Sequence, residues 1–121
     1  MKPFAPLAAL AVALAAAGGA LAHHGWAGYG DADFALTGRV EAADFAGPHG
    51  ELRVRDRSGV WLVVLGPSSR NSRAGLSAQT VPVGATVTAR GHRHRDAQRL
   101  EMKTERLVIG RRTFDIYPDR S

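Results

Sequence analysis

From residue 34 onward, apolar and polar positions alternate in short stretches, the pattern typical of half-buried β-strands. Leu36, Val40 and Ala42, for example, are separated by polar or small residues. Residues 60–65 are instead continuously apolar, which predicts a strand buried on both faces. Turn-forming Gly, Pro and Ser residues separate the stretches. The expected strands cover 36–42, 51–55, 60–65, 86–91, 100–109 and 113–117.

One helix is expected between the third and fourth strands. Gly66-Pro67 ends the third strand, and Ser68 or Ser69 is positioned to cap a short helix over residues 70–76. In the fifth strand, alternate residues share one face. These are Leu100, Met102, Thr104 and Arg106.

Five strands with a helix between the third and fourth follow the order of the OB-fold, a small, partly open barrel. A barrel also removes most unpaired strand edges. The alternative is a small β-sandwich. We therefore predict an all-β fold: an OB-like barrel of five to six strands over residues 34–118, preceded by an extended lead-in over residues 23–33.

Residues 1–22 have the composition of an export signal. Lys2 supplies a positive charge, residues 4–17 form an apolar run, and Ala20-Leu21-Ala22 has the small residues of a cleavage site. A membrane anchor needs about 20 apolar residues, and this run is shorter. We expect cleavage after Ala22, no membrane span in the mature chain, and a periplasmic or secreted location in a bacterium.

Several short motifs of the mature chain point to a known family. They are Ala22-His23-His24-Gly25-Trp26, Leu36-Thr37-Gly38-x-Val40, Pro48-His49, and Val83-Gly84-x-x-Val87-x-x-x-Gly91. The chain resembles an uncharacterised family of short exported bacterial proteins that begin Ala-His-His after the signal. It departs from that family at Gly47, where Asn is usual, and at Val83, where Pro is usual. The resemblance implies an exported, OB-like barrel and no assigned activity.

Composition excludes several kinds of chemistry. The chain has 121 residues, a net charge of +5 and no cysteine, so it holds one small domain without disulfides, a thiol nucleophile or a cysteine metal site. It has no Gly-x-Ser-x-Gly elbow, phosphate-binding loop or dinucleotide fingerprint. Its acidic residues are scattered and predict no catalytic pair. We expect a binding protein rather than an enzyme.

The five histidines supply the candidate chemistry. Cleavage after Ala22 would give His23 a free α-amine, so its amine and imidazole could chelate one metal. A further histidine imidazole would complete a set of three nitrogen ligands. His49 is the candidate for it, together with His23 or His24. Nitrogen ligands without thiolate favour Cu(II), with Zn(II) and Ni(II) as alternatives. We predict a metal site at His23, His24 and His49.

The lead-in is long enough to bring the paired histidines to several places on the barrel, because ten residues extend over roughly 30 Å. Trp26 and Tyr29 are expected to close the open end of the barrel and so anchor them. His92 and His94 share a strand face. Their loop and the loop of His49 flank the same face in an OB-fold. The arginines near His92 and His94, however, would oppose a cation bound by those two residues.

The outward-facing Arg53, Arg55 and Arg57 raise the question of polyanion binding. Proteins that bind single-stranded nucleic acid pair such charge with exposed aromatic side chains. Here acidic residues interleave the arginines, and export also argues against a nucleic-acid ligand. Our leading hypothesis is an exported metal carrier or accessory protein, most consistent with copper. The alternative is a structural or interaction module of the cell envelope that binds a partner protein or an anionic polymer through its β-face.

Overall fold

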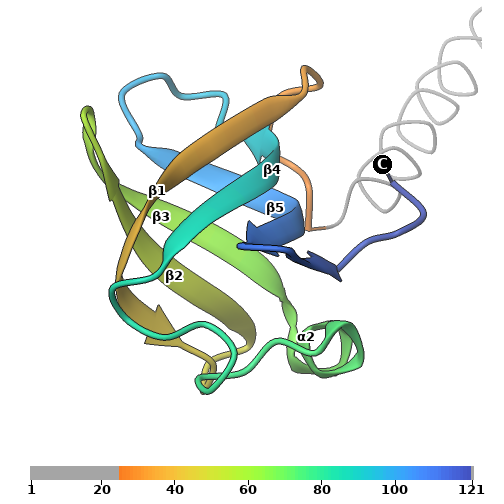
Figure 1. Cartoon of the computed structure of the whole chain (residues 1–121). Helices are drawn as coiled ribbons and strands as arrows, with labels where there is room; N and C mark the ends of the chain where they lie inside the picture. Colours follow the sequence, from red (N-terminus) through yellow and green to blue (C-terminus); the bar gives the residue numbers. More distant parts are fainter. Residues whose placement is uncertain (1–24, 121) are drawn as a thin grey trace, which may run out of the picture.

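The computed structural model describes residues 25–120 (Figure 1). The expected signal peptide, residues 1–22, and the paired histidines His23 and His24 lie outside the described residues. Within these residues, three strands precede one short helix and three follow it. In order they are β1 (Phe34–Asp44), β2 (His49–Asp56), β3 (Gly59–Pro67), α2 (Ser68–Ala74), β4 (Thr86–Arg93), β5 (Glu101–Ile109) and β6 (Arg112–Asp115).

The strands form one sheet in the order β3-β2-β1-β4-β5-β6, and β3 also pairs with β5. This last pairing is parallel, joins Val63 to Met102, and closes five strands into a barrel. β6 adds a hairpin to β5 through Leu107 and Phe114. α2 follows β3 at the end of the barrel where β1 turns into β2 (Figure 1). The prediction of an all-β, OB-like barrel with a helix between β3 and β4 is therefore confirmed.

The barrel interior is filled by aliphatic side chains from alternate strand positions, as the period of two predicts. Each strand from β1 to β5 contributes, so burial of apolar surface holds the closed sheet together. The most deeply buried side chains include Val40, Leu52, Val54, Val63, Leu65, Val87, Met102 and Leu107.

α2 begins earlier than the sequence pattern indicates, and the expected serine cap is wrong. Pro67 occupies the N-cap and offers no side-chain cap bond. The buried Asn71 stabilises the entry instead: its Oδ1 accepts the Gly66 N–H at 3.0 Å, and its Nδ2 donates to the Gly66 carbonyl at 2.7 Å. Gly75 then ends the helix in the left-handed conformation that glycine tolerates.

A β-bulge in β5 changes the face that the sequence assigns to Arg106. Thr104 pairs with Gly91, and Arg106 pairs with Arg90, so Glu105 is an extra residue in the ladder. The alternation shifts by one residue, and Leu107 rather than Arg106 follows Thr104 into the core. Gly91 permits this close approach, because a Cβ there would collide with the Lys103 carbonyl group.

The expectation that β3 is buried on both faces is also wrong. Trp61, Val63 and Leu65 are buried in the core, but Leu62 and Val64 on the other face are only half-buried. The second face points outward from the barrel, where solvent reaches part of it. None of the helices in the described part of the chain combines the length and apolar character needed to cross a bilayer.

Candidate functional site

The outer face of β5 carries three charged side chains that are nevertheless buried. Glu101, Lys103 and Glu105 are only 7%, 3% and 7% exposed. They are covered because residues 25–33 fold over them on one side and the chain after β6 on the other, where the Ile116 and Tyr117 N–H groups both bond the Glu105 carbonyl. Buried charges need compensation, so this covered face is the natural place to look for a site.

Trp26 is the centre of the covering layer. Its ring meets Tyr117 edge-on at 5.2 Å and His92 edge-on at 5.7 Å between ring centroids. The Arg120 guanidinium lies 3.9 Å from the Trp26 centroid, and Lys103 Nζ lies 5.5 Å from it. Two aromatic and two cationic contacts therefore fix Trp26 against the barrel.

Tyr29 fixes the lead-in at a second point. Its hydroxyl donates to Glu101 Oε2 at 2.5 Å, and its ring meets His94 edge-on at 5.4 Å. Burial, together with the hydrogen bond to Glu101, holds the pKa of Tyr29 well above its ordinary value. Trp26 and Tyr29 thus lie on the outside of β4 and β5, not in the open end of the barrel as the sequence suggested.

His92 is a structural residue of this layer. Its Nδ1 lies 3.1 Å from the Ala32 carbonyl oxygen, and its Nε2 lies 3.2 Å from Glu105 Oε2. The same Glu105 oxygen accepts Arg120 Nε at 3.1 Å. Both ring nitrogens of His92 are therefore engaged, which leaves none for a metal.

His94 shares the outer face with His92, as its position two residues away predicts. Its Nδ1 accepts the Asp96 N–H at 3.0 Å. Figure 1 shows the β4–β5 connection, residues 94–100, at the opposite end of the barrel from the β1–β2 connection. The β4–β5 connection therefore does not bring His94 to His49, and the expectation that the two loops flank one binding face stays a prediction.

A cavity of about 550 Å³ opens beside Trp26. His49, the first residue of β2, lines it from the barrel, and Gly25 lines it from the lead-in. A Cβ on Gly25 would lie only 4.0 Å from Lys103 Nζ. The residue that directly follows His24 therefore shares a cavity with His49. Within residues 25–120, no three His, Asp or Glu side chains form a ready metal site.

The cavity is electropositive. Arg70, Lys103 and Arg120 line it, and Asp119 is the carboxylate among its lining residues. Arg70 Nη1 donates to the Ile116 carbonyl at 3.3 Å and lies 3.9 Å from the Asp119 carboxylate, which is 73% exposed. Three cationic side chains against one carboxylate leave the lining with a net positive charge.

Lys103 is the residue that the sequence reasoning missed. Desolvation by the protein, and to a lesser degree the Arg120 guanidinium, lowers the pKa of Lys103. No ion pair forms at Lys103 within residues 25–120. One signal was available: apart from Lys2, it is the only lysine in an arginine-rich chain.

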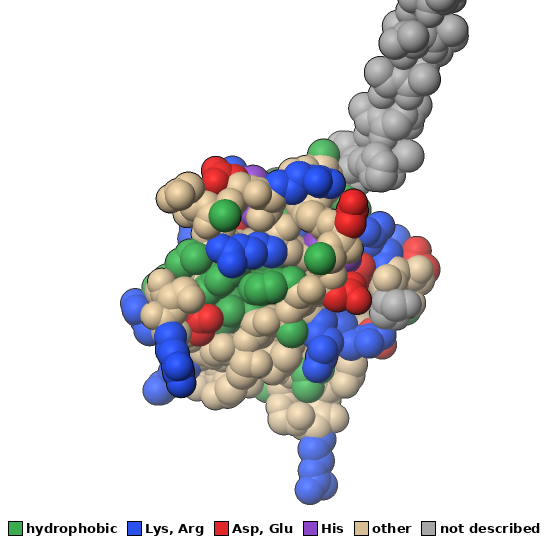
Figure 2. Space-filling view, turned by 90° about the horizontal axis from the view of Figure 1, so that it is seen from above, with side chains coloured by type: hydrophobic (Ala, Val, Ile, Leu, Met, Phe, Trp, Pro, Cys, Tyr) green, Lys and Arg blue, Asp and Glu red, His purple; other side chains and the backbone are tan. Residues whose placement is uncertain are grey.

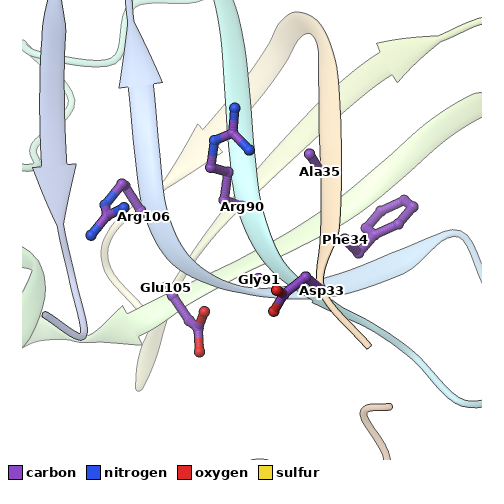
Figure 3. Close-up of a pocket in the computed structure, with 7 residues that line it drawn as sticks. All are labelled: Asp33, Phe34, Ala35, Arg90, Gly91, Glu105 and Arg106. Atoms are coloured by element: carbon purple, nitrogen blue, oxygen red, sulfur yellow. The ribbon is translucent and has the colours of Figure 1, made fainter. Parts of the chain in front are cut away.

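A second pocket, of about 410 Å³, lies where β1, β4 and β5 meet (Figure 3). Figure 3 shows the guanidinium groups of Arg90 and Arg106 on one side and the carboxylates of Asp33 and Glu105 on the other. Arg106 pairs with Asp115, and Glu105 pairs with His92 and Arg120. Two of its four charged lining residues are thus paired inside the protein, and the other two, Asp33 and Arg90, have opposite charges, so this pocket has weaker grounds for a charged ligand.

The fold defines a small OB-like barrel whose lead-in and tail cover one strand and leave a cationic cavity between them. The chain belongs to a family of unknown function, DUF6152, whose model matches residues 10–103. A family without an assigned function agrees with what the motifs implied, whereas export and the N-terminal histidine pair stay predictions. A search of curated proteins gave no significant match.

Solved structures support the fold. One similar chain comes from the crystal structure of the S. pombe Stn1-ten1 complex, with a TM-score of 0.53 and 21% sequence identity. The match covers 66% of this chain and 59% of that one, so the chain spans well under two thirds of its neighbour's length. At this identity the likeness concerns the barrel alone.

Proposed function

We propose that the protein is an exported carrier or accessory protein for a transition metal, most consistent with copper, and not an enzyme. The site is formed by His49 together with His23 or His24. One observation carries the proposal: Gly25, the residue after His24, lines the same cavity as the exposed His49. Consecutive Cα atoms are about 3.8 Å apart, so the short distance along the chain from Gly25 allows His24 or His23 to contact that cavity.

The chemistry depends on export. Cleavage after Ala22 turns the backbone nitrogen of His23 into a primary amine, which can chelate a metal together with the His23 imidazole. The His49 imidazole supplies a third nitrogen. Such a set, without thiolate or carboxylate, suits Cu(II), the strongest binder in the divalent series.

The lead-in supports the proposal by limiting where the histidines can go. Trp26 is held by Tyr117 and Arg120, and Tyr29 by Glu101. A segment fixed directly after the ligands loses less conformational entropy when the metal binds. Such pre-organisation would raise the affinity of the site.

The positive charge of the cavity, in contrast, lowers the expected affinity for a metal. A divalent cation beside Arg70, Lys103 and Arg120 is opposed by their charge. The site is therefore expected to bind its metal with limited affinity. Limited affinity suits a carrier, which must release its metal, better than it suits a permanent structural site.

A copper competition titration tests the proposal. Protein that begins at His23 should bind one Cu(II) with micromolar or tighter affinity. A Met ahead of His23, or the substitution His49→Ala, should weaken binding at least about tenfold, or about 1.4 kcal/mol. His94→Gln is the control, because His94 lies beyond Tyr29 and outside the cavity. Equal affinity for all four proteins would refute the proposed ligands.

A second candidate is an interaction module that binds a protein partner or an anionic polymer through its β-face. Arg53, Arg55 and Arg57 are all exposed. Seen from the end of the barrel that carries the β4–β5 connection, hydrophobic side chains gather between Lys and Arg side chains (Figure 2). The similar solved chain belongs to the crystal structure of a complex, S. pombe Stn1-ten1.

Retention on an immobilised polyanion tests the polymer-binding part of this candidate. Loss of retention in Arg53→Ser with Arg57→Ser would support it. A second variant that removes two exposed arginines elsewhere, Arg73→Ser with Arg111→Ser, is the matched control. Equal retention of both variants would show that retention depends only on the overall positive charge of the protein.

A further inference from the structure

We propose that the cavity beside Trp26 is also a binding site for a small oxyanion, a carboxylate or a phosphate, held by Lys103, Arg70 and Arg120. This inference needs neither the metal nor the residues that precede Gly25. It rests on described side chains only.

The burial of Lys103 is the first argument. The residue is 3% exposed, lines the cavity, and has no carboxylate partner within residues 25–120. The neighbouring Glu101 and Glu105 are engaged elsewhere, by Arg99 and Tyr29 and by His92 and Arg120. The Lys103 ammonium borders the cavity in a largely buried residue, and a partly desolvated ammonium without a counter-charge is unfavourable. An anion in the cavity would relieve this cost.

The aromatic rings beside Lys103 do not replace that counter-charge. Lys103 Nζ lies 5.5 Å from the Trp26 centroid and 5.9 Å from the Tyr117 centroid. At such distances cation–π attraction is modest. The same rings attract Arg120 over Trp26 and Arg70 over Tyr117, at 3.9 and 4.3 Å. The rings thus gather three cations around one cavity.

The geometry of the two arginines suits an oxyanion. Arg120 uses Nε to pair with Glu105, and Arg70 uses Nη1 to bond the Ile116 carbonyl. Each guanidinium has five N–H donors in a planar fork, so donors remain for a ligand. The cavity volume of about 550 Å³ far exceeds the roughly 30 Å³ that one water takes up, which leaves room for a carboxylate or phosphate.

The two tryptophans allow anion binding to be tested within one protein, with one ring as the probe and the other as the control. Trp26 borders the cavity, whereas Trp61 lies in the barrel wall with its indole N–H donated to Asp56 at 3.0 Å. In nitrogen–proton NMR spectra of chelator-treated protein, we expect inorganic phosphate or succinate to shift the Trp26 indole signal saturably. The Trp61 signal should stay fixed, and sodium chloride at equal ionic strength should shift neither.

Substitutions identify the donors. Lys103→Met keeps the length of the side chain and removes its charge, and it should weaken anion binding at least about tenfold. Arg70→Gln provides a second, partly exposed position with the same expected direction. Arg53→Met removes a charge from the exposed face of β2 and should change nothing.

The outcomes separate the anion sources and the two proposals. Tighter binding of succinate assigns a carboxylate, and tighter binding of phosphate assigns a phosphate. Either result stands even if copper fails to bind, since no metal is present. No saturable shift at Trp26, an equal shift at Trp61, or unchanged binding in Lys103→Met and Arg70→Gln would overturn the inference.

Discussion

Substitution of Trp26 tests whether the lead-in is docked on the barrel. Trp26 is half-buried and touches Tyr117, His92 and Arg120. A tryptophan in this position removes at least roughly 100 Å² of apolar surface from water, which contributes about 2.5 kcal/mol at about 25 cal/mol per Å². The edge-on contact with Tyr117 adds about 1 kcal/mol, and the ordering of the side chain offsets about 1 kcal/mol.

We therefore expect Trp26→Ala to lower the free energy of unfolding by about 2–3 kcal/mol, measured by urea denaturation. In a domain of this size the melting temperature should fall by about 10 °C or more. Trp26→Phe should recover part of the loss, because a ring remains to face Tyr117. If Trp26→Ala changed stability by less than about 0.5 kcal/mol, the range of ordinary surface substitutions, the lead-in would not be anchored and the argument from its position would fail.

Three further predictions follow from the same contacts. Thr104 is fully buried, and within the described residues its hydroxyl has no hydrogen-bond partner; Thr104→Val should therefore leave stability unchanged or raise it by about 1 kcal/mol in urea denaturation. Burial raises the pKa of both Tyr29 and Tyr117; phenolate absorbance should therefore appear at higher pH in the folded than in the unfolded protein. These folded pKa values lie above the unfolded value of about 10. The contribution of the two tyrosines to stability is therefore complete below about pH 10 and is lost as pH rises through the folded pKa values. A flat profile of stability against pH above pH 10 would contradict this. Removing the positive charge in Lys103→Met should strengthen copper binding in the competition titration, and weaker binding would contradict the proposed charge opposition.

The barrel could be predicted because each of its elements is specified by residues that are close together in the sequence. The alternation in residues 36–42 and 86–91, the turns, and the helix after Gly66-Pro67 each specify an element without reference to distant residues. The face of Arg106 could not be predicted in this way. It depends on the bulge at Glu105, which needs the partner strand and Gly91 to be known.

The candidate site was predictable only at its histidines. His49 could be named from its residue type, and the structure places it in one cavity with Gly25. Lys103 and Arg120 carry no motif. They reach the cavity because Trp26, 77 residues before Lys103 in the chain, folds back over β5. Such long-range burial of charge leaves no periodic signal in a single sequence.

The proposed site requires that the new N-terminal amine and the His49 imidazole bind one copper ion together. Electron paramagnetic resonance of the Cu(II) complex, formed on protein whose first residue has been verified as His23, tests this directly. We predict hyperfine coupling to three nitrogens, and an altered spectrum when His49→Ala removes one of them. A spectrum that is identical with and without the His49 imidazole, or a secreted protein that starts at another residue, would contradict the claim.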